Sequence, residues 1–241
     1  MRLRGYHLRG SNDVEDFNFD FKGEDHSPLN VVYIFGKNGS GKSYILGSIA
    51  RSWSGSILSG SSTDLSYIAD MLRIDYELGT DICSVHIRRG SLETSSTLAK
   101  FADIDVGENP HIKNGVIYYS SNRLVITRST VRGGSNFPGS TCSVFPIIYD
   151  LHMRGIRDSV ILIDDWDQSL DKESRKSFYT HLTRHAFSKG NQVILTSSNV
   201  PASWVPSQSV FSLRSRTDPT QASMKLLNSV EYFTREDMDF H

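Results

Sequence analysis

The stretch Ile34–Ser43 reads IFGKNGSGKS and places glycines, lysine and serine at a spacing that suits the binding of phosphate. It fits the pattern G-x-x-x-x-G-K-[ST], in which the glycines allow backbone N–H groups to converge on phosphate oxygens. Apolar residues precede the stretch and predict a buried strand. A helix is expected to begin inside it, so the positive end of that helix also points at the phosphate. This context predicts the binding of a nucleoside triphosphate.

The parts of this phosphate-binding loop have separate expected roles. Gly36, Gly39 and Gly41 permit the tight turn of the backbone. Lys42 is expected to reach the β- and γ-phosphates, and Ser43 to offer its hydroxyl to Mg²⁺. The remaining loop residues expected to line the nucleotide are Lys37, Asn38 and Ser40. The cofactors implied by this loop are ATP and Mg²⁺.

Two acidic residues, Asp164 and Asp165, follow directly after the apolar run Val160–Ile163. Hydrolysis of a bound triphosphate needs a carboxylate at the end of a neighbouring strand to hold Mg²⁺, and we assign this role to Asp164. Asp165 lies where a general base could polarise the attacking water. The pair therefore extends the prediction from nucleotide binding to an ATPase.

The elements that must position these residues can be predicted from the hydrophobic pattern. Arg2–Leu8 and Val14–Phe21 alternate apolar and polar residues, which predicts half-buried strands. Leu29–Phe35, Val160–Ile163 and Gln192–Thr196 are nearly all apolar, which predicts strands covered on both faces. Further strands are predicted at Ile74–Leu78, Ile82–Arg88, Val116–Tyr119 and Val210–Leu213.

Helices are predicted over Ser43–Arg51, Gly139–Met153 and Leu170–Lys189. Pro146 fits the second of them only if it lies in the first turn, and Gly190 is a plausible residue to end the third. Antiparallel strands followed by buried strands that alternate with helices indicate an α/β fold.

Composition sets the broad class of the chain. Of its 241 residues 38% are hydrophobic and 22% charged, and its net charge is −1, so no dominant surface for nucleic acid or anionic membrane is expected. Cys83 and Cys142 have no metal-ligand spacing, which predicts reduced thiols. No stretch approaches the roughly 18 apolar residues of a membrane span, and no secretory signal is evident. We therefore expect a cytoplasmic protein without a membrane partner.

The stretch Asp164–Asp171, DDWDQSLD, resembles the segment in ABC-type ATPases where the two acids run on into the D-loop and its Leu-Asp pair. Phe137–Thr141 (FPGST) lies where these proteins place their signature loop. Val116–Arg123 looks like the strand that leads into the Q-loop, and Gln192–Asn199 occupies the place of the strand that ends in the switch histidine. The order of these pieces is similar to the ABC-type heads of the RecF/SMC-like and OLD-like branch, across nearly the whole chain.

This resemblance implies a P-loop NTPase fold with an ABC-type head, in which an N-terminal antiparallel β-subdomain accompanies a mixed central sheet. Residues 1–241 would form a single domain. Residues 52–138 would be a β-rich or lid insertion between the helix of the phosphate-binding loop and the signature helix.

The resemblance also implies further site residues. Gly139, Ser140 and Asp171 would contact nucleotide, because the signature loop of the family caps the γ-phosphate bound by the other subunit of a dimer. Asn122, in the Q-loop segment, would be a further Mg²⁺ ligand. An aromatic residue under the adenine would come from the N-terminal strands, where the candidates are Tyr6, Phe17 and Phe19.

Three positions depart from the family pattern. The signature segment lacks Ser-Gly-Gly-Gln, Ser197 replaces the switch histidine, and Asp165 stands where the family has glutamate. A general base displaced by about 1 Å can lose on the order of 100-fold in rate. We therefore predict slow hydrolysis by Lys42, Asp165 and Ser197, with ATP acting mainly as a clamp between two heads.

Three functions are compatible with an ABC-type head of this kind. A transporter subunit is disfavoured because it would carry a fuller signature and a switch histidine. The preferred interpretation is a stand-alone head that dimerises on ATP and regulates a separately encoded effector, often a nuclease, in anti-phage defence or DNA repair. The alternative is an ATP-clamped module that grips DNA or a partner with little turnover, with Arg123, Arg128 and Arg132 as phosphate contacts.

Overall fold

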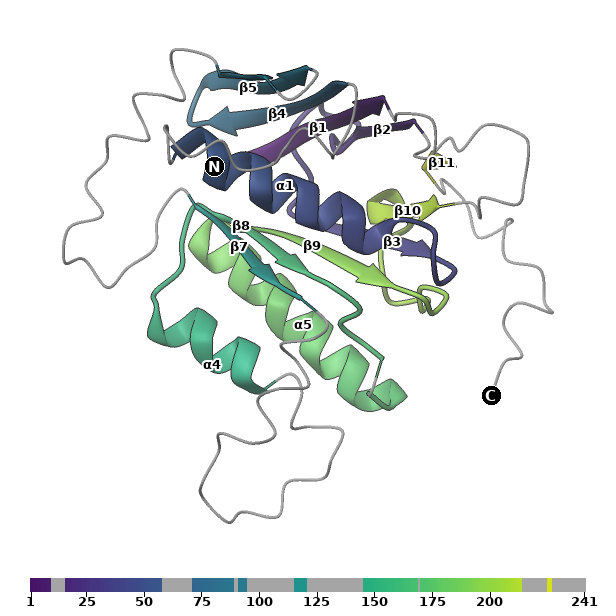
Figure 1. The fold of residues 1–241 in the computed structure, drawn as a ribbon. Helices are drawn as coiled ribbons and strands as arrows, with labels where there is room; N and C mark the ends of the chain where they lie inside the picture. Colours follow the sequence, from purple (N-terminus) through teal and green to yellow (C-terminus); the bar gives the residue numbers. More distant parts are fainter. Residues whose placement is uncertain are drawn as a thin grey trace.

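The computed structural model describes residues 1–9, 16–57, 71–88, 91–94, 115–120, 145–168, 170–213 and 225–226. Within these residues the chain forms two sheets with one helix between them and two helices on the far side of the second sheet (Figure 1). The predicted α/β fold with an antiparallel subdomain and a mixed central sheet is confirmed.

The first sheet is antiparallel, with the strand order β2-β1-β4-β5-β6. Its strands are β1 (Arg2–Arg9), β2 (Phe17–Asp20), β4 (Met71–Leu78), β5 (Asp81–Arg88) and β6 (Ser91–Thr94). Apolar and polar residues alternate along β4 because one face packs on the core and the other meets solvent. The first two N-terminal strands and the strands predicted at Ile74–Leu78 and Ile82–Arg88 therefore belong to one sheet, whereas the predicted strand Val116–Tyr119 joins the other.

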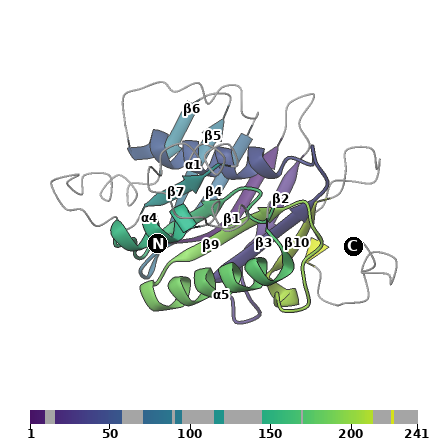
Figure 2. The same cartoon turned by 90° about the horizontal axis from the view of Figure 1, so that it is seen from below.

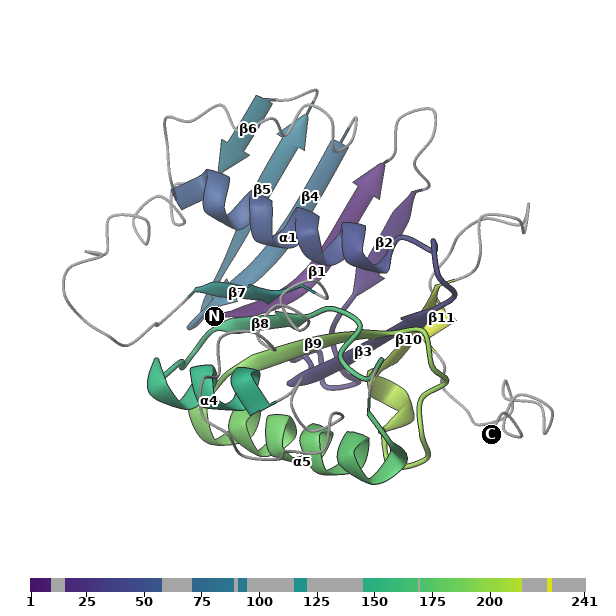
Figure 3. The same cartoon turned by 60° about the horizontal axis from the view of Figure 1, so that its bottom comes forward.

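The second sheet has the strand order β11-β10-β3-β9-β8-β7, and all neighbouring pairs are parallel except β11 with β10. Its strands are β3 (Val31–Gly36), β7 (Val116–Tyr119), β8 (Val160–Ile163), β9 (Gln192–Ser197), β10 (Val210–Leu213) and β11 (Lys225–Leu226). Every residue of β8 and β9 is buried, since both faces of the sheet are covered (Figure 3). The carboxyl ends of β3, β8 and β9 meet at one edge of this sheet, where α/β proteins bind their ligands.

Helix α1 (Lys42–Ile57) lies between the two sheets (Figures 1 and 3). Ile45, Leu46 and Ile49 are fully buried, and they join one hydrophobic cluster with residues from both sheets. The first turn of α1 therefore has little freedom to move relative to the strand before it, which is the condition for a preorganised phosphate-binding loop.

Helices α4 (Phe145–Met153) and α5 (Lys172–Lys189) cover the other face of the second sheet (Figure 2). Pro146 occupies the first turn of α4, as the sequence requires, while residues 139–144 of that predicted helix lie outside the described part of the chain. Helix α5 begins two residues later than predicted because Asp171 is an extended N-cap, and it ends at Gly190 in the left-handed conformation.

A buried glutamine ties the two sheets together. The Gln192 side chain accepts from the Leu3 N–H at 2.6 Å and donates to the carbonyls of Leu3 at 3.0 Å and Leu29 at 2.8 Å. All of its hydrogen-bonding positions are on backbone, so it fixes β1 against the start of β9. No helix in the described ranges combines the length and apolar character needed to cross a membrane.

Candidate nucleotide-binding site

Three glycines give the phosphate-binding loop its shape. Gly39 and Gly41 have φ angles of 82° and 94°, a conformation that residues with a side chain rarely adopt. A Cβ atom at Gly36 would lie 2.6 Å from the Ser40 hydroxyl and 2.9 Å from the Cβ of Leu213. The glycines are therefore required by backbone conformation at two positions and by close packing at the third.

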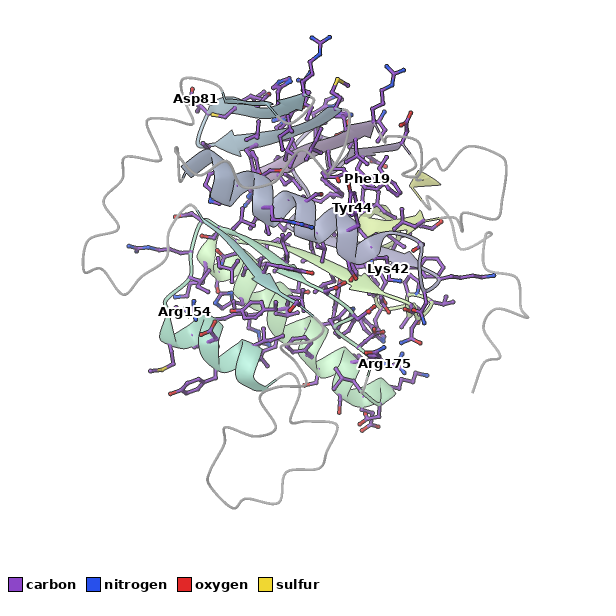
Figure 4. All side chains as sticks on the ribbon, viewed as in Figure 1. Phe19, Lys42, Tyr44, Asp81, Arg154 and Arg175 are labelled. Atoms are coloured by element: carbon purple, nitrogen blue, oxygen red, sulfur yellow. The ribbon has the colours of Figure 1, made fainter. Side chains whose placement is uncertain are left out.

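The Lys42 ammonium lies within the loop. Its Nζ donates to the carbonyls of Gly36 at 2.7 Å and Lys37 at 3.1 Å, and the residue is 5% exposed. Burial lowers the pKa of Lys42, and the negative charges of Asp165 and Asp164 oppose that shift. The ammonium is thus partly desolvated and close to two acids, so an anionic polyphosphate in the loop would be bound strongly. Figure 4 shows Lys42 at the N-terminal end of α1.

Two serines of the loop have hydroxyls suited to ligands. The Ser40 hydroxyl is buried and has no hydrogen-bond partner among the described residues. A buried hydroxyl left unpaired costs about 1–3 kcal/mol of stability, and a bound phosphate oxygen that accepts from it would remove this cost. Ser43, in the first turn of α1, is exposed and free to offer its oxygen to Mg²⁺. These observations fit the predicted cofactors.

Of the three aromatic candidates for an adenine contact, Phe17 packs against the loop. A Cβ at Gly41 would lie 3.1 Å from the Cζ of Phe17. Phe19 is buried in the hydrophobic core under the antiparallel sheet, as Figure 4 shows, and the Tyr6 hydroxyl is paired with Ser48 of α1 at 2.7 Å. Tyr6 and Phe19 therefore hold the sheet on α1, and Phe17 is the aromatic residue next to the phosphate site.

Asp164 lies at the end of β8 on the side of the sheet that faces α1. It is 1% exposed, and its Oδ1 accepts from the Thr196 hydroxyl at 2.6 Å while Oδ2 accepts from Tyr118 at 3.4 Å. Val160 and Leu162, four and two residues before Asp164, pack in the cluster around α1, and the alternation of the strand brings Asp164 to the same face. The carboxylate is therefore oriented by two hydroxyls on neighbouring strands.

Asp165 adopts a left-handed backbone conformation with φ 46°. Its N–H donates to the Thr196 hydroxyl oxygen at 3.0 Å, which stabilises this turn. Partial burial raises the pKa of the Asp165 carboxyl and the Asp164 charge adds to the effect, while Lys42 opposes it. A raised pKa moves the group toward the value that suits a general base.

Thr196 was not predicted as a site residue. The register of β8 with β9 pairs Ile163 with Leu195, so Thr196 must follow beside Asp164 once that register is known. The register itself is a pairing between strands far apart in sequence. The only local signal was a single hydroxyl at the end of an apolar run.

The structure corrects the expected placement of Ser197. Its hydroxyl donates to Asp167 at 2.6 Å on the face opposite the phosphate-binding loop, and the residue is fully buried. The next residue, Ser198, donates to the Asn38 side chain of the loop at 2.7 Å, and it lies close enough to Asp165 to lower the pKa of that carboxyl. Successive residues at a strand end point to opposite faces, so Ser198 takes the position beside the loop that was expected for Ser197.

Trp166 anchors the acidic turn to α5. Its ring lies 5.7 Å from Phe178 and 6.2 Å from Tyr33, and it is 2% exposed. The Trp166 backbone N–H donates to the Thr196 carbonyl at 3.3 Å. The residue after the two acids is thus part of the core between the second sheet and α5, and it limits the movement of Asp165.

Several predicted site residues have other surroundings or lie outside the described residues. Asp171 caps α5, where its two oxygens accept from the N–H of Ser174 at 2.8 Å and from its hydroxyl at 2.9 Å. These bonds hold the pKa of Asp171 below its usual range. The residues outside the described part of the chain are Asn122, Arg123, Arg128, Arg132, Gly139, Ser140 and Thr141.

In the described part of the chain, no group of three or more His, Cys, Asp or Glu side chains is arranged to hold a metal ion. Mg²⁺ in nucleotide sites usually takes one or two protein oxygens and completes its shell with phosphate and water. Ser43, exposed in the first turn of α1, and Asp164, buried at the end of β8, carry oxygens of that kind, and their role as Mg²⁺ ligands stays a prediction.

The chain has the fold of an SMC head domain. It is similar to the SMC head domain from Thermotoga maritima, with 15% identity and a TM-score of 0.55 over 93% of this chain and 97% of that one. An SMC head bound to the C-winged helix domain of ScpA is 12% identical, with a TM-score of 0.53 and the same coverage. Stu0660 of Streptococcus thermophilus is 12% identical, with a TM-score of 0.50 over 95% of this chain and 78% of that chain. No family model and no curated protein matches the sequence.

At these identities the comparisons establish the fold. They confirm the predicted fold class, a mixed α/β fold with an ABC-type head, over nearly the whole chain.

Proposed function

We propose that the chain is an ATP-binding head that hydrolyses ATP slowly, dimerises when ATP is bound and regulates a separately encoded effector. One observation carries the ATPase part of the proposal. The loop with Lys42 and the acids Asp164 and Asp165 come from sequence positions far apart, yet Lys42 and both acids are close enough to influence one another electrostatically. That arrangement suits binding and hydrolysis of a triphosphate.

In this mechanism the loop N–H groups and Lys42 would bind the β- and γ-phosphates, and Ser43 and Asp164 would hold Mg²⁺, which would neutralise phosphate charge. Asp165 takes the proton of the attacking water. Ser198, through its contacts with Asn38 and Asp165, holds the end of the loop and the base together. Lys42, Asp165 and Ser198 are the catalytic residues of the proposal, with Ser198 in place of Ser197.

Hydrolysis is expected to be slow for two reasons. The Asp165 side chain is one methylene shorter than the glutamate of the family, and a hydroxyl at Ser198 brings no positive charge to the γ-phosphate. We expect turnover below about 10 s⁻¹, the median for enzymes. Asp165→Ala should abolish turnover and leave ATP affinity within a few-fold of wild type, whereas faster turnover than this median would contradict the slow-switch proposal.

The effector part of the proposal rests on analogy of fold. A structural neighbour binds a winged helix domain of ScpA, which supports a protein partner for this head as well. A pull-down of the tagged chain with the proteins encoded beside it, with and without ATP, tests this. Recovery of a nuclease or other enzyme supports regulation in defence or DNA repair, and recovery of the chain alone argues against it.

One observation favours the alternative of a DNA-gripping module. The outer face of the antiparallel sheet carries Arg9, Arg73 and Arg88 on three neighbouring strands, all exposed. Arg73 is partly neutralised by Asp75 at 2.9 Å. DNA binding through such a surface should weaken steeply with salt. Duplex binding that is lost in the Arg9→Glu, Arg88→Glu double variant would favour this module.

A further inference from the structure

Asp167 is a buried carboxylate between the acidic turn and α5, and its residue is 3% exposed. Its Oδ1 accepts from the Ser197 hydroxyl at 2.6 Å, and its Oδ2 accepts from the Asn199 side-chain amide at 3.0 Å. The Arg175 guanidinium lies 3.8 Å from Oδ2. A carboxylate is costly to bury unless it is hydrogen bonded and paired, so this set of donors explains why it is tolerated.

The two hydrogen-bond donors to Asp167 lie immediately before and after Ser198. The Asn199 N–H also donates to the Ser197 hydroxyl oxygen at 2.9 Å, and its carbonyl accepts from Tyr33 at 3.4 Å. Both neighbours of Ser198 are therefore fixed on the α5 side of the sheet. The Ser198 side chain is left on the opposite side, where it contacts the loop and Asp165.

The other end of this network reaches the start of α5. Arg175 donates from Nε to the Leu170 carbonyl at 3.0 Å, and the Leu170 N–H donates to the Asp167 carbonyl at 3.2 Å. Figure 4 shows Arg175 in α5, near the end of the molecule that carries Lys42. Asp167 therefore connects three segments: the turn with Asp165, the turn with Ser198, and the first turn of α5.

We propose that Asp167 is a positioning residue for ATP hydrolysis, which acts by holding Ser197 and Asn199 so that the Ser198 hydroxyl stays on Asn38, next to Asp165. This inference rests on the proposed function. Asp167 hydrogen bonds to Ser197 and Asn199 on the α5 side of the sheet, and its charge raises the pKa of Lys42 less than the charges of Asp165 and Asp164 do. Loss of its carboxylate should therefore impair the hydrolytic step and leave nucleotide binding intact.

The first test separates binding from turnover in Asp167→Ala. We expect the Kd for a fluorescent ATP analogue to stay within about threefold of wild type. The single-turnover rate should fall by about 10- to 100-fold, the loss typical of a group displaced by about 1 Å. Asp75→Ala is the matched control, because Asp75 also accepts from a serine hydroxyl at 2.6 Å and an arginine at 2.9 Å, but on the antiparallel sheet. It should leave both quantities unchanged.

A double-mutant cycle shows whether Asp167 acts through Ser198. In the Ser198→Ala background, Asp167→Ala should reduce turnover by less than about twofold. Asp167→Asn keeps the volume and one acceptor oxygen for Ser197, but its side-chain amide faces that of Asn199, so its turnover should be intermediate between wild type and Asp167→Ala. This variant replaces Asp167→Ala if the alanine variant does not fold. The proposal is overturned if the rate losses of the two single variants multiply in the double variant. It is also overturned if Asp167→Ala lowers ATP affinity by the same factor as the rate.

Hydrogen exchange gives a readout that does not depend on hydrolysis. The Asn199 backbone N–H should exchange at least tenfold faster in Asp167→Ala than in wild type, because the Ser197 hydroxyl that accepts from it is no longer held by the carboxylate. If wild type neither binds nor hydrolyses ATP, the proposed function fails while this measurement still tests the contact. Unchanged exchange at residues 197–199 would overturn the positioning role even in an active ATPase.

Discussion

Thr196 contacts both acids of the candidate site. One hydroxyl donates to Asp164 and accepts from the N–H of Asp165, so Thr196→Val leaves a buried carboxylate oxygen and a backbone N–H unpaired. We expect a loss of about 1–3 kcal/mol in the free energy of unfolding, measured by urea titration, and a lower single-turnover rate. Thr196→Ser keeps the hydroxyl and is the control. Equal stability and rate in the two variants would contradict the bridging role.

A second prediction concerns the backbone of the loop. Gly41→Ala forces a side chain into a φ of 94° and brings its Cβ to 3.1 Å from Phe17. We expect a cost of about 1–3 kcal/mol in stability and a clear loss of ATP affinity. Gly47→Ala, inside α1, meets only the end of the flexible Arg51 side chain at 3.3 Å. It should be neutral or gain up to about 1 kcal/mol, measured in the same unfolding experiment.

Single residues of the site differ in how far the sequence could predict them. The loop residues from Gly36 to Ser43 are contiguous, so their mutual placement follows from a local pattern. Ser197 and Ser198 could not be distinguished, because β9 is buried at all six positions and gives no polar alternation to show which face each residue takes. Asp167 was passed over for a similar reason, since its partners come from β9 and α5.

At the scale of elements, the packing of α4 on α5 contains a buried histidine. The His185 ring lies 5.5 Å from that of His152 on α4, and its Nδ1 is 3.3 Å from the Asn191 side-chain nitrogen. Burial lowers the pKa of His185 to about 4, and the nearby charges of His152, Lys189 and His181 add to this shift. The folded chain therefore favours the neutral imidazole.

The sign of the resulting pH dependence follows from linkage. The unfolded chain has an ordinary imidazole pKa near about 6.5, so it binds the proton first as pH falls. Stability from His185 is complete above about 6.5 and is lost as pH falls from there toward 4. His185→Gln should show a smaller decline in thermal midpoint over this range than wild type. His26→Gln, at an exposed loop position, should decline as wild type does, and identical curves for all three would refute the assignment.

Elements were predicted well where the local pattern is strong. Val116–Tyr119, Val160–Ile163 and Val210–Leu213 have the boundaries predicted from their apolar runs. Pairing between distant strands could not be predicted: β1 and β4 are adjacent in the first sheet but are separated by β2, β3 and α1 in sequence. The insertion expected between α1 and the signature helix therefore contributes, through β4 to β6, to the N-terminal sheet rather than forming a unit of its own.

At the scale of the whole molecule, the proposed nucleotide site lies at an edge of the second sheet, where β3 leads into α1 and β8 leads into the acidic turn. The proposed ATP clamp uses this edge as the contact between two heads. Asp171 and the segment with Gly139 and Ser140 are the residues that the resemblance assigns to the partner's nucleotide. Their role across a dimer stays a prediction, and Asp171 serves within the chain as the cap of α5.

The most direct test is the mass of the chain in sedimentation experiments with ATP and Mg²⁺, paired with a turnover measurement. We predict a monomer without nucleotide, a dimer with ATP in wild type, and a longer-lived dimer in Asp165→Ala. Lys42→Ala should stay monomeric throughout, because its ammonium is needed to bind the phosphates. A mass that ATP leaves unchanged in both wild type and Asp165→Ala would contradict the central claim of an ATP-dependent, slowly hydrolysing dimer.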